Sequence, residues 1–500
     1  MKLVSKILAV SLGLVLGCIV FVKAAGQSIN TPQERSGASR VQWMRAIEPE
    51  ILRLHAAART RDVTNVISCS PSPCIFVPTQ ASEGGFEVAD ATVVIDPTDH
   101  KHILVGSRDF NCTFPSELGF HVSRDGGSTW SVKCLDSIIT HDYVFWPVGP
   151  DASVAYDSNG VAYIAGDYAD SETGNNGFVG FEKSADGVHW SPPAVALHVP
   201  ARGGISFTGD TWLTIDTNLQ SPHLNDVYVS GVVVGGDSQQ YDEVVVSHSS
   251  DGGNRWHDVV VAGVQVFPAL DYYTNMAVGK DGTVYLTWMY CNTGPNACND
   301  HRAYMLFSKS SDGGSTWSKP RLMTTATLMS TYLPNTNVSV TNYPVIGVDN
   351  SLGPHTGNLY VAFYNWTGSY VQVDIIRSSD GGATWSKPVP VAPKQTHDQF
   401  FPWLSVSPTG LIGVSWLDRR NDPANIDYQA FAAISTDGGQ SFAPNIQLTT
   451  AFSDPNNSGY PGWMGNRTGN TWAASNFIAA WMDSSNGVNM QTVVGGIRLK

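Results

Sequence analysis

The stretch Ser123-Arg-Asp-Gly-Gly-Ser-Thr-Trp130 is the first of six copies of one turn, and the spacing of the copies decides the fold. The other copies begin at Ser184, Ser249, Ser310, Ser378 and Ser435, at intervals between 57 residues (378 to 435) and 68 residues (310 to 378). The aspartate of each copy can accept backbone hydrogen bonds, and the glycine after it adopts the positive φ that a tight turn needs. Each copy, which we call an Asp-Gly turn, therefore joins two antiparallel strands.

A second pattern recurs between the Asp-Gly turns: a strand, a short turn and a strand rich in Val, Tyr and Trp. We call the residue before the first strand the leading residue; in seven successive units it is Asp90, Asp151, Asp210, Tyr273, Tyr343, Phe401 and Asn470. Four short strands cannot bury both faces of a sheet alone, but radially stacked sheets cover one another. The sequence therefore predicts an all-β fold, a seven-bladed propeller over residues 81–500 with Asp-Gly turns in six blades.

The seventh unit is incomplete in sequence order. It has strands near residues 472–475, 477–481 and 489–498, after which the printed chain ends. Its outer strand is expected from residues 74–78, far upstream. The two ends of the propeller segment would then close the ring.

The first 80 residues differ from the repeats. Residues 1–25 combine a basic start, a short apolar run and small residues, which is typical of a secretory signal peptide. A lipid-modified Cys18 is an alternative. Residues 26–80 form an N-terminal extension, in which apolar residues at helical spacing predict one amphipathic helix over residues 41–59. We expect a secreted protein, periplasmic or extracellular.

Six cysteines follow the predicted signal peptide, and they fall into close pairs. The pairs are Cys69 and Cys74, Cys112 and Cys134, and Cys291 and Cys298. An even number of cysteines in an exported chain predicts disulfides, and local pairing is the simplest of the fifteen connectivities. The spacing of metal ligands does not occur, so neither a metal nor another cofactor is expected.

The charge balance limits the partners. The formal net charge is −14, and only 14% of the residues are charged. Nucleic-acid binding needs a basic face, so this acidic chain is not expected to bind nucleic acid. We expect a monomer that associates with no membrane once the signal peptide is removed.

The six Asp-Gly turns resemble the Asp-box (bacterial neuraminidase repeat) superfamily of sialidase-like propellers, over roughly residues 81–500. The phrase Trp416-Leu-Asp-Arg-Arg-Asn-Asp422 is similar to a bacterial secreted subgroup of sialidase-like proteins. A sialidase would imply three arginines on the substrate carboxylate, a tyrosine nucleophile with a glutamate partner, and an aspartate acid/base. The chain has no Arg-Ile-Pro motif near its first unit and no glutamate after Glu243. The superfamily also contains other glycosidases, polysaccharide-degrading enzymes and non-catalytic binding proteins.

In a propeller, the leading residues and the loops after the second strands meet at one mouth of the axis, opposite the Asp-Gly turns. Carboxylates there suit acid–base chemistry on a sugar, and aromatic rings suit stacking against it. The candidate catalytic residues are Asp90, Asp151, Asp210 and Tyr273, the last as a nucleophile. The candidate substrate-binding residues are Arg108, Arg419, Arg467, Asp418, Tyr343 and Phe401.

Arg108, Arg419 and Arg467 belong to neighbouring blades of a closed ring, so they could converge on a carboxylate despite their distance in sequence. Each candidate also has a structural alternative. The leading residues could cap strands and fill the channel, and a tyrosine such as Tyr273 could be buried for packing. Asp418 could pair with the adjacent Arg419 or with Arg420.

The leading hypothesis is a secreted, sialidase-like glycoside hydrolase that acts on an acidic or complex glycan, with Asp90 or Asp151 as acid/base. The main alternative is a non-catalytic propeller that binds a glycan or a protein through the same mouth. A polysaccharide lyase is a third hypothesis.

Overall fold

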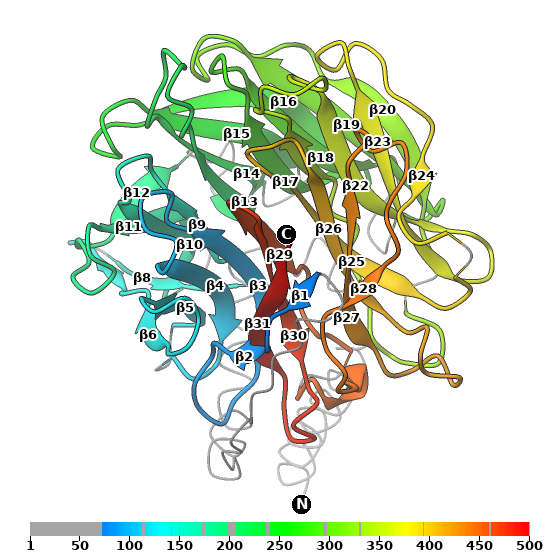
Figure 1. The fold of residues 1–500 in the computed structure, drawn as a ribbon. Coiled ribbons are helices and arrows are strands. Elements are labelled where there is room, and N and C mark those ends of the chain that lie inside the picture. The colour runs from blue at the N-terminus through cyan, green and yellow to red at the C-terminus, as the bar shows by residue number, and fades with distance from the viewer. Residues whose placement is uncertain are drawn as a thin grey trace, which may run out of the picture.

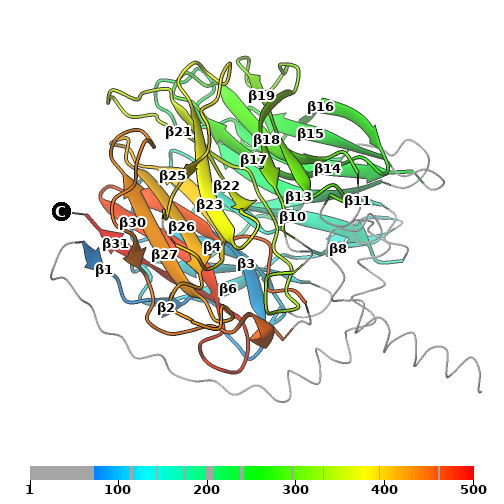
Figure 2. The same ribbon diagram turned by 90° about the vertical axis from the view of Figure 1, so that its right-hand side faces the viewer.

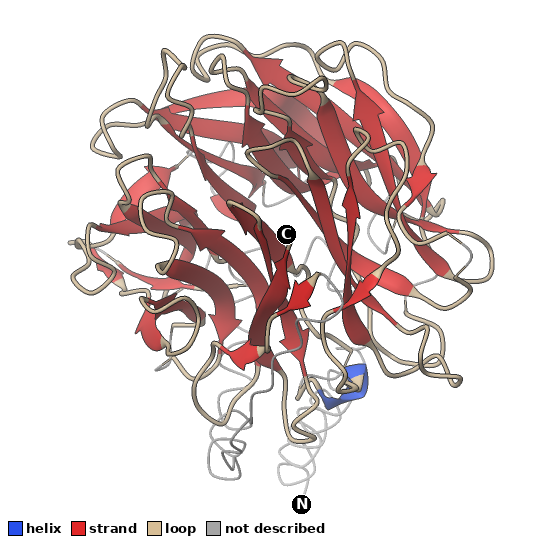
Figure 3. Cartoon of the chain, in the orientation of Figure 1, coloured by secondary structure: helices blue, strands red, loops and turns tan. Residues whose placement is uncertain are grey.

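The computed structural model describes residues 73–499, except 113–115, 142, 150, 173–175, 199–205, 237–240, 294–297, 330–331, 394 and 460–461. Seven sheets surround a central axis (Figure 1). In the described part nearly all regular structure is strand (Figure 3), and the one short helix is the 3-10 turn η1 (Pro455–Asn457). The predicted all-β, seven-bladed propeller is therefore confirmed.

Blades 1, 3 and 4 are four-stranded antiparallel sheets. Blade 1 consists of β3 (Val88–Ile95), β4 (Ile103–Asp109), β5 (Leu118–Ser123) and β6 (Ser131–Cys134). Blade 3 consists of β13 (Ser206–Ile215), β14 (Val227–Gly235), β15 (Tyr241–Ser249) and β16 (His257–Val266). Blade 4 consists of β17 (Leu270–Val278), β18 (Val284–Cys291), β19 (Arg302–Ser310) and β20 (Arg321–Thr327).

Blades 5 and 6 repeat the same order, and blade 2 has two extra short strands. Blade 5 consists of β21 (Val345–Val348), β22 (Leu359–Trp366), β23 (Val371–Ser378) and β24 (Val389–Pro390). Blade 6 consists of β25 (Gln399–Val406), β26 (Ile412–Asp418), β27 (Gln429–Ser435) and β28 (Ile446–Gln447). Blade 2 consists of β7 (Ile138–Ile139), β8 (Val144–Pro147), β9 (Ser153–Tyr156), β10 (Ala162–Asp170), β11 (Gly177–Ser184) and β12 (Ala194–Leu197).

Blade 7 joins the two ends of the described chain. Its C-terminal strands are β29 (Gly469–Ala473), β30 (Asn476–Asp483) and β31 (Gln491–Arg498), and its outer strands are β1 (Cys74–Ile75) and β2 (Thr79–Gln80). Cys74 pairs with Arg498 and Thr79 with Val494, both antiparallel. Figures 1 and 2 show β1 and β2 beside β31. The outer strand expected around residues 74–78 thus closes the ring.

The innermost strands carry β-bulges at four leading residues. The pairing register shifts between Ala89 and Thr92, Gly209 and Trp212, Tyr272 and Asn275, and Phe400 and Trp403. Inside these bulges φ is positive, at 60° for Asp90, 56° for Asp210, 58° for Tyr273 and 50° for Phe401. A bulge changes the direction of a side chain, and positive φ is strained for a bulky ring. The propeller therefore uses strained backbone to orient side chains at its axis.

Each Asp-Gly turn is held by its own serine and aspartate. In all six turns the serine hydroxyl donates to the aspartate two positions later, at 2.7–3.1 Å. In the first turn, hydrogen bonds from the side chain and the backbone of Thr129 lower the pKa of Asp125 to about 2. These aspartates are therefore structural, as the sequence indicated.

Neighbouring blades are linked at the same end of the propeller. In the second, third and fourth Asp-Gly turns, the residue directly before the serine contacts a glycine of the Asp-Gly turn in the next blade. Lys183 Nζ donates to the carbonyl of Gly252 at 2.7 Å, and Lys309 Nζ to that of Gly381 at 2.9 Å. The equivalent His248 packs under Gly314, where an added Cβ would lie 3.2 Å from the imidazole.

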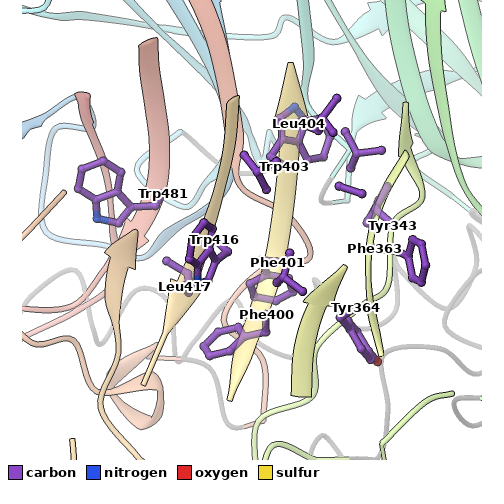
Figure 4. Close-up of a cluster of buried hydrophobic side chains, with 14 of the residues drawn as sticks. Tyr343, Phe363, Tyr364, Phe400, Phe401, Trp403, Leu404, Trp416, Leu417 and Trp481 are labelled. Atoms are coloured by element: carbon purple, nitrogen blue, oxygen red, sulfur yellow. The ribbon is translucent and has the colours of Figure 1, made fainter. Parts of the chain in front are cut away.

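Large apolar side chains fill the space between sheets. In Figure 4, Phe400, Phe401 and Trp403 lie along β25. On one side of them is Trp416 on β26, and on the other is Tyr343, which precedes β21 in the sequence. All five side chains are buried. Each aromatic ring removes about 150–250 Å² from water, so these contacts between blades contribute much of the stability.

Two of the predicted local disulfides are present, Cys112–Cys134 and Cys291–Cys298. Cys74 is also disulfide-bonded, and Cys69 lies outside the described residues. The predicted signal peptide, Cys18 and the helix expected over 41–59 lie outside them too. Across the described ranges, no helix has the length and hydropathy needed to cross a membrane.

Candidate functional site

The axis brings Asp90, Asp151 and Arg467 together from blades 1, 2 and 7. Burial acts to lower the pKa of Arg467, but electrostatic interactions with Tyr343, Asp151, Asp90 and Asp167 outweigh it and raise that pKa. Arg467 Nη2 donates to the carbonyl of Ala152, beside Asp151, at 2.8 Å. The expected convergence of an arginine with these two aspartates is therefore found for Arg467.

The surroundings of Asp90 favour the protonated form of its carboxyl group. Burial raises the pKa of Asp90 to about 7, and the charge of Asp151 adds to the rise. Arg467, the backbone N–H of Asn466 and Arg108 oppose it. Asp90 Oδ2 has no hydrogen-bond partner among the described residues. A carboxyl group with this pKa can release and take up a proton near neutral pH.

Asp210 of blade 3 joins the same cluster through its backbone. Its N–H donates to Asp151 Oδ2 at 3.1 Å, and its carbonyl accepts from Thr274 Oγ1 at 2.7 Å. The next residue, Thr211, donates through Oγ1 to Asp167 Oδ1 at 2.5 Å. Asp167 was not among the candidate site residues drawn from the sequence, and in the structure it lies within β10.

Aromatic rings form the opposite side of the axis. The Tyr343 ring centroid lies 4.4 Å from that of Tyr273 and 6.3 Å from that of Trp403. Burial raises the pKa of Tyr343 well above its usual value, so the phenol stays protonated. Arg467 Cζ lies 5.7 Å from the centre of this ring and 5.6 Å from that of Trp212, within cation–π range.

Two tryptophans were not singled out from the sequence. Trp212 and Trp403 each follow a leading residue by two positions, and their ring centroids lie 5.1 Å apart across the axis. Phe401 contributes its carbonyl, which accepts from Thr468 Oγ1 at 2.8 Å, while its ring packs against Phe400. Their positions two residues after Asp210 and Phe401 were the one signal in the sequence that could have drawn attention to them.

The other two candidate arginines have carboxylate partners of their own. Arg108 Nη2 lies 2.7 Å from Glu117 Oε2. Arg108 also lowers the pKa of Asp90, but less than Arg467 does. Arg419 Nη1 lies 3.3 Å from Asp398 Oδ2. The electrostatic interactions that raise the pKa of Arg419 are with Asp398, Asp422 and Tyr428, whereas those of Arg467 are with residues of the axial cluster. The structure thus groups Arg108 with Arg467 around Asp90 and places Arg419 in a separate ion pair.

Asp418 pairs with an arginine of its own loop, which was the structural alternative to substrate binding. Its Oδ2 lies 2.5 Å from Arg420 Nη2 and accepts from Trp416 Nε1 at 2.7 Å. Both partners belong to the same blade. Asp418 therefore fixes the loop after β26 in place, and substrate binding by it stays a prediction.

The axial cluster is shielded from water. Its most exposed candidate is Asp210, with 8% of its surface accessible. The other candidates at the axis, Asp90, Asp151, Tyr273, Tyr343, Phe401 and Arg467, are at most 3% exposed. The open mouth expected from the sequence is thus closed over these groups. No group of three or more potential metal ligands occurs in the described part.

Comparison with known proteins yields similarity in fold at low identity. No protein-family model matches the chain, and no curated protein matches it. A protein of unknown function from Dyadobacter fermentans is 18% identical, over 70% of this chain and 94% of its own, with a TM-score of 0.44. The Hadza microbial sialidase Hz136 is 14% identical, over 79% of this chain and 76% of its own, with a TM-score of 0.44.

Another solved structure with a similar fold is the GH93 α-L-arabinofuranosidase of Fusarium graminearum in complex with arabinobiose. It is 10% identical, over 84% of this chain and 97% of its own, with a TM-score of 0.43. The structural neighbours thus include glycoside hydrolases. At these identities the residues at the axis, and not the neighbours, decide what can be proposed for this chain.

Proposed function

We propose that this protein is a secreted, sialidase-like glycoside hydrolase whose reaction takes place at the axial cluster. The observation that carries the proposal is Asp90, a buried carboxyl group with a pKa of about 7 beside the charges of Asp151 and Arg467. Glycosidases use one carboxylic acid that keeps its proton and a second carboxylate. The local disulfides support export, because such bonds persist in oxidising compartments.

Asp90 and Asp151 have different roles in the proposed reaction. Asp90 donates its proton to the glycosidic oxygen while the bond from that oxygen to the anomeric carbon breaks. The carboxylate of Asp151 stabilises the positive charge that develops on the sugar, and a water molecule supplies the hydroxyl group that replaces the leaving group. Asp90, which gave its proton to the leaving group, takes up the proton lost by this water, so both carboxyl groups return to their starting states.

Arg467 and the aromatic rings position these groups. Arg467 lowers the pKa of Asp90 against the effect of burial, which keeps the proton available near neutral pH. Its hydrogen bond to Ala152 also fixes the backbone beside Asp151. The Tyr343 ring packs against those of Tyr273 and Trp403 and lies within cation–π range of Arg467, which holds the guanidinium group in place.

A non-catalytic propeller that binds a glycan is the second candidate function. It is favoured over catalysis because the candidate residues at the axis, of which the most exposed, Asp210, is 8% accessible, leave a bound sugar little access to the carboxyl groups that catalysis needs. It is also favoured by the absence of any glutamate after Glu243 in the sequence.

One experiment separates the two functions. The full-length protein is tested for turnover of a panel of aryl glycosides and oligosaccharides, beside the Asp90→Asn and Asp151→Asn variants. The matched control is Asp99→Asn, on an exposed turn between β3 and β4 where half of the aspartate side chain is accessible. We expect turnover by the wild type and the control, and loss in both axial variants. Saturable binding without product by the wild type would support the second function instead.

A further inference from the structure

The segment of residues 462–468, between η1 and β29, contacts several blades around the axis, and we call it the axial loop. Every one of its residues is buried. Arg467 donates to the carbonyl of Ala152 in blade 2 at 2.8 Å, and Thr468 Oγ1 donates to the carbonyl of Phe401 in blade 6 at 2.8 Å. The axial loop is therefore tied to blades on both sides of the one that it leads into.

Asp90 of blade 1 lies directly against the axial loop. The backbone N–H of Asn466 donates to Asp90 Oδ1. A Cβ added to Gly465 would lie 3.1 Å from the backbone nitrogen of Asp90 and 3.3 Å from the Cβ of Ala89. The axial loop and the bulge that carries Asp90 are thus packed backbone against backbone, and the hydrogen bond orients the carboxyl group.

Asn466 is itself held by two donors. Thr341 Oγ1, which precedes β21 of blade 5, donates to the carbonyl of Asn466. Trp463 Nε1 donates to Asn466 Oδ1 at 3.2 Å. All three side chains are buried, so water does not compete for these bonds. The N–H that binds Asp90 is therefore fixed from another blade and from within the axial loop.

The two oxygens of the Asp90 carboxyl group have different surroundings. Oδ1 accepts the N–H of Asn466, whereas Oδ2 has no hydrogen-bond partner among the described residues. A backbone N–H can only donate, and in a protonated carboxyl group the oxygen without the proton is the better acceptor. The bond from Asn466 therefore favours the form of the acid in which Oδ2 carries the proton.

We propose that the axial loop is the positioning element of the acid: through Asn466 it holds Asp90 Oδ1 and makes Oδ2 the oxygen that gives its proton to the glycosidic oxygen. This inference rests on the proposed function for the destination of the proton. The O–H bond at Oδ2 breaks as the new O–H bond forms on the leaving group, and the carboxylate that remains keeps its hydrogen bond from Asn466. Asn466 and Thr341 are positioning residues that act through Asp90.

The Thr341→Val variant tests the positioning role, because it removes the hydroxyl group that holds Asn466 and nearly keeps the shape of the side chain. Burial raises the pKa of Asp90 to about 7 and the hydrogen bond from Asn466 opposes the rise, so a loosened axial loop raises this pKa further. We expect the decline of kcat/KM with rising pH to move up by about half a pH unit or more. Thr341→Ser, which keeps the hydroxyl group, should retain the wild-type profile. The matched control is Ser308→Ala, which removes a buried hydroxyl group that donates to the carbonyl of Ser318 at 2.6 Å in blade 4 and should leave the profile unchanged.

The pH dependence of stability tests the axial loop without any turnover. The free energy of unfolding is measured across the pH range for the wild type and Thr341→Val, each with and without Asp90→Asn, so that the differences isolate the contribution of Asp90. Arg467, Arg108 and Asp151, which also act on Asp90, are present in all four proteins. The contribution of Asp90 falls until pH passes its folded pKa, so it should level off at a higher pH in Thr341→Val. Levelling at the same pH in both backgrounds would overturn the inference, with or without turnover of a glycoside.

Neutron crystallography of the deuterated protein locates the proton itself. Crystals are kept at about pH 5, below the pKa of Asp90, so that the carboxyl group is protonated. We expect deuterium on Oδ2 and a hydrogen bond from Asn466 to Oδ1. A wild type that turns over no glycoside would overturn the proposed function and the destination of the proton, and this map would still test the orientation of Asp90. Deuterium on Oδ1 would overturn the inference even in an active enzyme.

Discussion

Arg467 donates a hydrogen bond to the carbonyl of Ala152 across 315 residues of sequence, at 2.8 Å. The contact exists because blade 7 and blade 1 are neighbours in the closed ring, with blade 2 beyond them. It places the guanidinium group against Asp151 and Asp90. The whole candidate site depends on this placement.

Replacing Arg467 with methionine is expected to destabilise the protein by about 3 kcal/mol, because buried carboxylates lose the charge that balances them. The free energy of unfolding in urea measures the effect. Arg255→Ala is the control, since Arg255 is 85% exposed and its ion pair with Asp251 lies at the surface. A small loss in both variants would show that Arg467 does not hold the axis together.

The pKa of Asp90, about 7, predicts a decline of kcat/KM as pH rises through 7, because the acid loses its proton. The folded pKa is raised, so this group stabilises the fold fully below its unfolded value near 4, and that contribution disappears as pH rises through 7. Asp90→Asn should lower the activity on substrates with poor leaving groups and remove this pH dependence of stability. A kcat/KM that does not change between pH 6 and 8 would contradict the assignment.

His248 is expected to make the joint between blades 3 and 4 sensitive to acid. Burial lowers its pKa, and the nearby His257 lowers it further, while Asp312 and Asp258 oppose them. Because the folded pKa of this base is lowered, the contribution is present above its unfolded pKa of about 6.5 and is lost as pH falls below that value.

The other blades provide the matching substitution for that joint. Lys183 and Lys309 occupy the position equivalent to His248 and bind the next turn. We expect His248→Lys to lose less stability between pH 7 and 5 than the wild type, as measured by thermal unfolding. His100→Gln, on an exposed turn, should behave as the wild type does. An identical acid loss in all three proteins would exclude His248 as its source.

Two glycines of the Asp-Gly turns separate backbone strain from steric clash. Gly126 has a φ of +78° and no atom within 4 Å of an added Cβ, so Gly126→Ala should cost about 1 kcal/mol from strain alone. Gly253 has a φ of +88°, but an added Cβ would lie 2.5 Å from the Phe181 ring. Gly253→Ala should cost about 1–3 kcal/mol more. Equal losses would show that Phe181 moves without cost.

The blade architecture could be predicted because its signal is local and repeated. An Asp-Gly turn needs only a few consecutive residues, and six copies at similar intervals, together with the seven strand pairs, fix the number of units at seven. The meeting of Arg467 with Asp90 and Asp151 followed from ring closure, which required no knowledge of side-chain contacts. The position of a residue in a symmetric fold could therefore be predicted from the sequence.

The hydrogen-bond and ion-pair partners of side chains, and their exposure to solvent, were harder to predict from the sequence. Arg419 binds Asp398, a loop residue that carries no motif, whereas the pairing of Asp418 with Arg420 was one of the two that the sequence offered. The bulges that give Asp90 and Tyr273 a positive φ insert one residue into a regular strand and leave no mark in the hydrophobic pattern. The burial of the axis results from these bulges and from side chains of several blades, so it required the structure.

The most direct test of the account compares two leaving groups in the Asp90→Asn variant. A general acid is needed when the leaving group is poor and hardly needed when it is a dinitrophenolate, which departs without a proton. We predict that the variant loses kcat/KM by about a hundredfold or more on an alkyl glycoside and by far less on the dinitrophenyl glycoside of the same sugar. Equal losses on both substrates, or no loss on either, would contradict the role of Asp90 as the acid of an axial glycoside hydrolase.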